Sequence, residues 1–144
     1  MSALLVSCNT TDKTLLAELQ QHVSTFTQVT ADTEKAVQTS KDIRALLEEA
    51  PEAFLSDPNN PLTQLKDQSD MVANRLTVRE IDYKEVSQKL QKILQDYIAG
   101  KLTSEEVKRE LHFLETRIKD APAFLVETNK RLADIKEKAE ALLK

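Results

Sequence analysis

Apolar residues alternate at spacings of four and three along most of this 144-residue chain, and this heptad pattern limits the folds open to it. The pattern covers residues 12–50, 61–99 and 103–143, in series that run from Leu15 to Ala50, from Leu62 to Tyr97 and from Val107 to Leu142. Each series lasts for about five heptads, and three or four in succession already favour coiled-coil packing. The pattern therefore predicts an all-α protein with three long helices.

The residues between the three stretches are typical of helix ends. Asn60 precedes Pro61, an arrangement that caps a helix and places proline at its first position. Gly100 suits the residue that follows a helix, and the segment from Thr103 to Glu106 (TSEE) reads as a capping box. These signals agree with the ends of the three heptad series.

The connection at residues 100–102 is so short that the second and third helices must be antiparallel neighbours. We predict an elongated antiparallel up-down-up three-helix bundle with coiled-coil-like heptad packing, built as a single domain over residues 12–144. Pro122 lies inside the third helix, where a proline removes a hydrogen bond and bends the axis. Because the heptad series continues past it, a third helix kinked near Pro122 is favoured over two helices, the second capped by Asp120.

Composition argues against several classes of function. A single glycine leaves no Gly-rich loop for phosphate, and one cysteine excludes both an internal disulfide and a cysteine-based metal site. The net charge is −4, and no basic cluster is interleaved with aromatic residues, which argues against nucleic-acid binding. No run approaches the roughly 20 apolar residues that span a bilayer. We expect neither catalysis nor a cofactor.

Each histidine on its own is a candidate metal ligand, but the sequence does not supply the further ligands that a metal site needs. His22 occupies a heptad position with Glu18 one turn before it, and His112 is followed three residues later by Glu115. Carboxylate-rich metal sites in bundles draw similar pairs from several helices, and the sequence has no second pair of this kind. We expect a partly buried, hydrogen-bonded His22, a solvated His112 and no metal site.

Polar residues interrupt the heptad series at Thr33, Ser40, Ser69, Arg79 and Thr128. Polar core layers can fix the register between helices, or they can line a groove for a partner. The first of these is the simpler interpretation. For Arg79 we expect a side chain that extends toward solvent or pairs with Glu80 or Asp82.

The N-terminal segment Leu5-Val6-Ser7-Cys8 holds the only cysteine of the chain, between the apolar run Ala3–Val6 and the polar residues Asn9-Thr10-Thr11. It resembles the lipobox of bacterial lipoproteins, in which a signal peptidase cuts before the cysteine and its sulfur carries lipid. The chain departs from that family's pattern because only seven residues, without Lys or Arg, precede Cys8. We therefore expect that the true start lies upstream of Met1.

The resemblance implies a lipid anchor on Cys8, with residues 1–11 as a signal-peptide remnant and tether. In enterobacterial members an aspartate after the cysteine retains the protein in the inner membrane, and here that residue is Asn9. The implied place is the cell envelope, on the periplasmic side of the outer membrane. The alternative is a cytoplasmic protein in which Cys8 is an incidental thiol.

The connection Pro51–Asn60 carries Phe54 and Leu55, which need cover from the C-terminal leucines or from a partner, and it has room for a short helical turn. We predict a non-catalytic, lipid-anchored binding or structural module, monomeric, with Phe54 and Leu55 as candidate partner-binding residues. A cytosolic coiled-coil adaptor or assembly subunit is the alternative. A helical carrier of an apolar ligand is a weaker one, supported only by the threonine-rich first helix.

Overall fold

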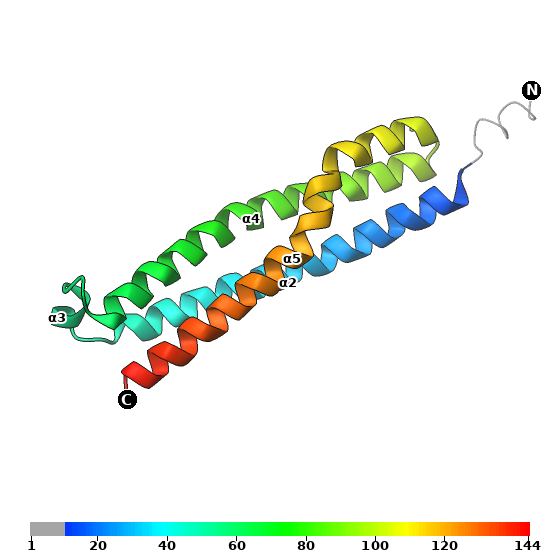
Figure 1. Cartoon of the computed structure of the whole chain (residues 1–144). Helices are drawn as coiled ribbons and strands as arrows, with labels where there is room; N and C mark the ends of the chain where they lie inside the picture. Colours follow the sequence, from blue (N-terminus) through cyan, green and yellow to red (C-terminus); the bar gives the residue numbers. More distant parts are fainter. Residues whose placement is uncertain (1–10) are drawn as a thin grey trace, which may run out of the picture. The chain divides into compact units, whose positions relative to one another are not determined.

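A computed structural model of the chain describes residues 11–144, and this part is all-helical, with no β-strand. Four helices follow one another: α2 (Lys13–Glu48), α3 (Glu52–Leu55), α4 (Pro61–Ile98) and α5 (Ser104–Leu142) (Figure 1). The all-α prediction is confirmed. The three long helices begin and end within two residues of the ranges expected from the heptads, and α3 is the short helical turn expected in the connection.

The hydroxyl of Tyr97 joins the ends of three helices. It accepts a hydrogen bond of 2.9 Å from the backbone N–H of Asp12 and lies 2.6 Å from the hydroxyl of Ser104. Asp12 also caps α2, because its carboxylate accepts hydrogen bonds from the N–H groups of Thr14 and Leu15 at 2.9 and 3.1 Å. One buried tyrosine therefore fixes where α2 and α5 begin relative to the end of α4.

Gly100 ends α4 in a Schellman motif. Its φ is +75°, a left-handed value that glycine adopts without a Cβ clash. The N–H of Gly100 bonds to the Tyr97 carbonyl at 3.1 Å, and the N–H of Lys101 bonds to the Asp96 carbonyl at 2.8 Å. The predicted role of Gly100 is confirmed.

The predicted N-terminal caps of α4 and α5 are also present. Asn60 Oδ1 accepts a 2.9 Å hydrogen bond from the N–H of Leu62, with Pro61 at the first helical position. Thr103 and Glu106 form the reciprocal capping box: the Thr103 hydroxyl accepts from the Glu106 N–H at 3.1 Å, and the Glu106 carboxylate accepts from the Thr103 N–H at 3.2 Å.

Pro122 lies within α5, which continues through it as one helix. The alternative of two helices separated at this proline is therefore wrong. Packing of the residues on both sides holds the helix together, although Pro122 cannot donate to the carbonyl of Ile118. The kink expected at this position stays a prediction.

Contacts within the described chain group into two compact units. Unit 1 comprises residues 11–30 and 82–121, and unit 2 comprises residues 31–81 and 122–144. Each unit therefore takes one segment from each long helix. The prediction of a single domain over residues 12–144 stays a prediction.

The core of unit 2 is an aliphatic cluster built from all three long helices. Its buried members are Ala36, Ile43, Leu47, Ala50, Leu62, Leu65, Val72, Leu76, Leu132, Ile135 and Ala139. Leu55 and Leu143 are partly buried and pack against this cluster. Each buried Leu or Ile side chain contributes roughly 1.5–3 kcal/mol to folding, so the cluster is the main source of stability in this unit.

The core of unit 1 contains aromatic residues as well as aliphatic ones. Phe26 and Tyr83 are fully buried, and their rings meet edge to face with centroids 6.0 Å apart. Aliphatic residues of all three long helices complete the core: Leu15, Leu19, Val29, Val86, Leu90, Ile93, Val107 and Leu114.

The heptad series predicted the buried positions closely. Every position of the three series is buried except His22, Arg79, Leu111, Ile118 and Leu142. The polar members Thr33, Ser40, Ser69 and Thr128 are buried as well, so polar side chains do enter the core layers.

Two of these polar residues leave a hydroxyl unsatisfied. Ser40 is 3% exposed and Ser69 1% exposed, and neither hydroxyl has a hydrogen-bond partner among residues 11–144. A buried unsatisfied polar group costs about 1–3 kcal/mol, so these two layers do not add stability through hydrogen bonds.

Substitution of Ser69 should therefore have a very different effect on the free energy of unfolding from substitution of Leu76, a core leucine of the same helix. We expect Ser69→Ala to leave the free energy of unfolding unchanged or to raise it by about 1 kcal/mol, because it removes the unsatisfied hydroxyl. Leu76→Ala should lower it by about 2–5 kcal/mol through loss of burial and a cavity. Urea denaturation followed by circular dichroism measures both, and a loss above about 1 kcal/mol for Ser69→Ala would contradict this account.

Candidate docking grooves

The candidate residues from the sequence lie in different places. Cys8 lies outside the described residues. Phe54 is 46% exposed on α3, and its carbonyl accepts a 2.7 Å hydrogen bond from the Thr63 hydroxyl, which ties α3 to the start of α4. Leu55 packs against the core of unit 2, so Phe54 is the more exposed residue of this pair.

The two histidines line one groove in unit 1, between α2 and α5. We call it the histidine groove; its lining residues are Leu15, Glu18, His22, Lys108, Leu111, His112, Glu115, Ile118 and Lys119. His22 Nε2 lies 3.5 Å from Glu18, and His112 Nδ1 lies 3.3 Å from Glu115. No group of three or more potential metal-ligating side chains occurs in the described part of the chain.

Sequence spacing could not reveal the histidine groove, because its two sides come from helices about 90 residues apart. Three of the five heptad positions that are not buried, His22, Leu111 and Ile118, line it. The core of unit 1 is therefore incompletely covered between α2 and α5, and the groove there has a volume of about 510 Å³.

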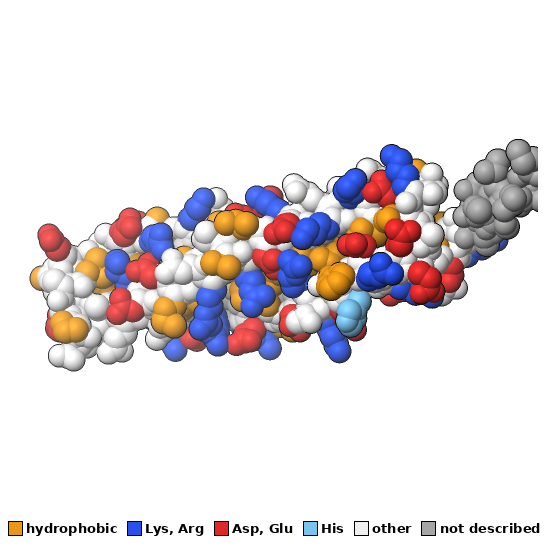
Figure 2. Space-filling view, turned by 90° about the horizontal axis from the view of Figure 1, so that it is seen from above, with side chains coloured by type: hydrophobic (Ala, Val, Ile, Leu, Met, Phe, Trp, Pro, Cys, Tyr) orange, Lys and Arg blue, Asp and Glu red, His pale blue; other side chains and the backbone are white. Residues whose placement is uncertain are grey.

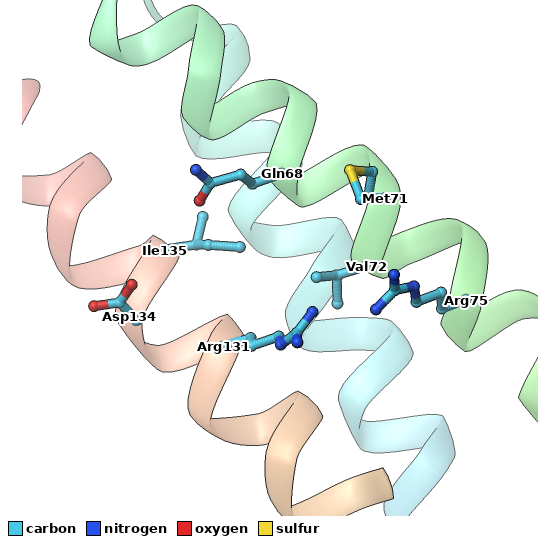
Figure 3. A pocket seen from close by; sticks show the side chains of 7 residues that line it. All are labelled: Gln68, Met71, Val72, Arg75, Arg131, Asp134 and Ile135. Carbon is cyan, nitrogen blue, oxygen red and sulfur yellow. The ribbon is translucent and has the colours of Figure 1, made fainter.

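A second groove lies in unit 2, between α4 and α5. We call it the arginine groove; it consists of a hollow of about 230 Å³ and an adjoining one of about 50 Å³, which share Val72, Arg75 and Arg131. The other lining residues are Gln68, Met71, Phe124, Glu127, Thr128, Asp134 and Ile135. In Figure 3, Val72 and Ile135 point toward the facing helix, and the guanidinium of Arg131 reaches from α5 toward α4.

The apolar part of the arginine groove continues along the exposed side of α4. Met71 is 56% exposed and Val78 is 66% exposed, and they lie seven residues apart on one face, with Arg75 between them. Methionine, phenylalanine and arginine are enriched at protein–protein interfaces, and all three occur in this groove.

Charges on the α5 side of the arginine groove are paired within α5. Arg131 contacts Glu127 at 2.7 Å, and Asp134 contacts Lys138 at 3.0 Å. Both are pairs of residues four apart on one helix, which contribute roughly 0.3–0.5 kcal/mol each. This rim is close to neutral.

On the α4 side, Arg75 lines the groove, and Arg79 lies one turn further along α4 in contact with the lining residue Phe124. Within residues 11–144, neither Arg75 nor Arg79 forms an ion pair. The nearby acid Asp70 is engaged by Arg44 at 3.1 Å and Lys66 at 3.4 Å. The α4 rim therefore presents two positive charges that the described chain does not neutralise.

Arg79 differs from the sequence prediction in its partner. Its guanidinium carbon lies 4.9 Å from the centroid of the Phe124 ring, a cation–π contact. Asp82, one of the expected partners, instead accepts a 3.0 Å hydrogen bond from Arg117 on α5. The pairing of Arg79 with Asp82 is therefore wrong, because Arg117 reaches this carboxylate from the neighbouring helix.

A third groove, of about 450 Å³, lies between α4 and α5 in unit 1 and includes the exposed Phe113. Its three cations are Lys89, Lys92 and Arg117, and each contacts an acid of α4: Glu85 at 2.9 Å, Asp96 at 3.2 Å and Asp82 at 3.0 Å. The hydrogen bond and charge of Lys89 hold the pKa of Glu85 below its usual range. All three cations of this groove therefore have an acidic partner within the chain, unlike Arg75 of the arginine groove.

The remaining surface is mixed in charge. Figure 2 shows basic and acidic side chains interspersed over one face, with apolar side chains in small separate patches. Among residues 11–144, no helix has the length and apolar character that crossing a membrane requires. Comparison with protein-family models, with curated proteins and with solved structures finds no match to this chain.

If the arginines of α4 do not contribute to stability, replacing one of them should leave the free energy of unfolding nearly unchanged. We expect Arg75→Ala to change the free energy of unfolding by less than about 0.5 kcal/mol, as for a surface residue without partners. Arg117→Ala should cost about 1–2 kcal/mol, because it breaks a half-buried charged hydrogen bond between helices. Thermal denaturation can compare the two variants, and an equal cost for Arg75→Ala would show that this arginine has a structural role.

Proposed function

We propose that the protein is a non-catalytic helical binding module, attached through lipid on Cys8 to a membrane of the bacterial cell envelope. The support for the anchor is the lipobox-like Leu5-Val6-Ser7-Cys8, the absence of any other cysteine in the sequence and the polar residues that separate Cys8 from α2. The resemblance to enterobacterial lipoproteins favours the periplasmic side of the outer membrane.

In this proposal the three long helices form an elongated up-down-up bundle with one chain per molecule. The two-residue Lys101–Leu102 link between the Gly100 cap and the Thr103 cap supports an antiparallel pair of α4 and α5. The kink expected in α5 belongs to the same proposal and rests on Pro122.

The arginine groove is the observation that supports binding most directly. It combines Met71, Phe124 and Arg75 in its lining with Arg79, which contacts Phe124, and neither Arg75 nor Arg79 has a carboxylate partner in the described chain. Surface arginines that only add solubility need not lie beside an exposed methionine and a partly buried ring. Contact with another protein would use both features, since interfaces combine apolar anchors with arginine.

Catalysis has no comparable support. The recorded partners of the two histidines are glutamates, Glu18 for His22 and Glu115 for His112, and neither pair includes a nucleophile. Phe54 remains a candidate for a secondary contact at α3, where just under half of the residue is exposed.

The anchor is tested by growing expressing cells with an alkyne analogue of palmitate. We expect label on the wild-type protein and none on Cys8→Ala. Because the chain has one cysteine, the variant is a complete control for thioester and thioether attachment. Wild-type protein without label, or equal label on both proteins, would reject the anchor and favour the cytosolic adaptor.

The docking surface is tested by a photo-crosslinking amino acid placed at Val78 or, as a control, at Thr27, an exposed residue of α2 in unit 1. We expect a discrete crosslinked protein from position 78 that weakens when Arg75→Glu is added, and no such product from position 27. The same product from both positions, or one that is indifferent to Arg75→Glu, would contradict docking at the arginine groove.

The histidine groove gives one specific reason to retain the apolar-ligand carrier as a second candidate. Leu15, Leu111 and Ile118 line it, and the last two are only partly buried. Native mass spectrometry of the purified protein would show a bound small molecule if this function is correct. A mass equal to that of the chain alone would count against it.

A further inference from the structure

We infer that the arginine groove binds an acidic amphipathic helix of a partner protein, with two carboxylates one helical turn apart beside an apolar face. This inference deepens the proposed function as a binding module and does not depend on the lipid anchor. It rests on the shape, the apolar lining and the charge of the groove.

The apolar lining suits a helix. Met71 and Val78 lie seven residues apart on the exposed face of α4, which corresponds to about 10.5 Å along the axis. From α5, the partly buried ring of Phe124 contributes the facing side, and Ile135, which is 3% exposed, forms the buried floor. A partner helix laid along the groove would meet these side chains with residues at positions i, i+3, i+4 and i+7.

The charge of the groove selects an acidic partner. On α5, Arg131 and Asp134 already have partners of opposite charge four residues away. On α4, Arg75 and Arg79 have none within residues 11–144. An arginine–carboxylate contact in a partly desolvated groove is roughly twice as strong as a neutral hydrogen bond, so acids on the partner would be strongly preferred.

The spacing of the two arginines sets the spacing of the acids. Arg75 and Arg79 are four residues apart, about 6 Å along α4. The guanidinium carbon of Arg79 lies 4.9 Å from the centroid of the Phe124 ring, and a guanidinium has five N–H donors with which it can bind a carboxylate. Two acids at positions i and i+4 of the partner would match this pair.

An anionic membrane surface is a less suitable occupant. Glu127 and Asp134 line the same groove beside Arg131, so its α5 rim carries charges of both signs, whereas an anionic lipid surface presents only one. A peptide helix can place acids only opposite the arginines, whereas a lipid surface cannot avoid the carboxylates. The groove therefore favours a protein over a membrane.

The test uses the full chain and two fluorescent synthetic helices of about 21 residues. Both carry leucine at heptad positions, and they differ only in one pair of residues at i and i+4 beside the leucines: two glutamates in the first and two lysines in the second. Fluorescence anisotropy at 0.15 M salt should show the glutamate peptide binding at least tenfold more tightly.

Charge reversal provides the matched controls. Arg75→Glu with Arg79→Glu should weaken the glutamate peptide at least tenfold and favour the lysine peptide. Lys108→Glu with Lys119→Glu makes the same charge change in the histidine groove and should alter binding less than twofold. Circular dichroism should show equal helix content in all variants, since all four side chains lie at the surface or are only partly buried.

The inference is overturned if neither peptide binds, if both bind equally, or if the two pairs of substitutions have the same effect. It is also overturned if vesicles of phosphatidylglycerol and phosphatidylcholine bind in a manner lost with Arg75→Glu and Arg79→Glu, or if sedimentation shows self-association lost with the same change. Equal binding of both peptides would reject the acidic partner but not the proposed function as a binding module. The crosslinking experiment at Val78 tests that function directly.

Discussion

Burial of one apolar stripe on each long helix is the constraint on which the rest of this molecule depends. Aliphatic side chains from α2, α4 and α5 converge in the core of unit 2, and residues of the same three helices surround Phe26 and Tyr83 in unit 1. Isolated helices are only marginally stable in water even when their residues favour helix, so packing of these stripes accounts for most of their stability. Every surface feature is positioned by that packing.

The helices and their ends could be predicted from the sequence because they depend on interactions between residues that are close together along the chain. Heptad spacing located the buried positions, and Asn60, Gly100 and Thr103 marked caps that the structure contains. The histidine groove at Leu111 and the contact of Arg79 with Phe124 were not predictable in this way. They depend on how closely two helices approach, which spacing along one chain does not encode.

The distribution of ion pairs distinguishes the arginine groove from the groove beside Phe113. In the groove beside Phe113, all three cations contact acids of α4, and in the histidine groove both acids contact histidines. Arg75 and Arg79 combine positive charge, apolar neighbours and no ion pair within residues 11–144, and their planar guanidinium groups can bind a carboxylate through two N–H groups, unlike the lysines of the histidine groove. Recognition of an acidic helix would give these two charges a partner.

The methyl group of Met71 permits the most direct measurement of this claim. The chain contains two methionines, Met1 and Met71, so ¹³C-methyl labelling of methionine gives a spectrum with very few signals. Addition of the acidic helix should shift the Met71 signal in a saturable manner and leave that of Met1 unchanged. A bound helix that leaves the Met71 signal where it was would show that the arginine groove is not the docking site.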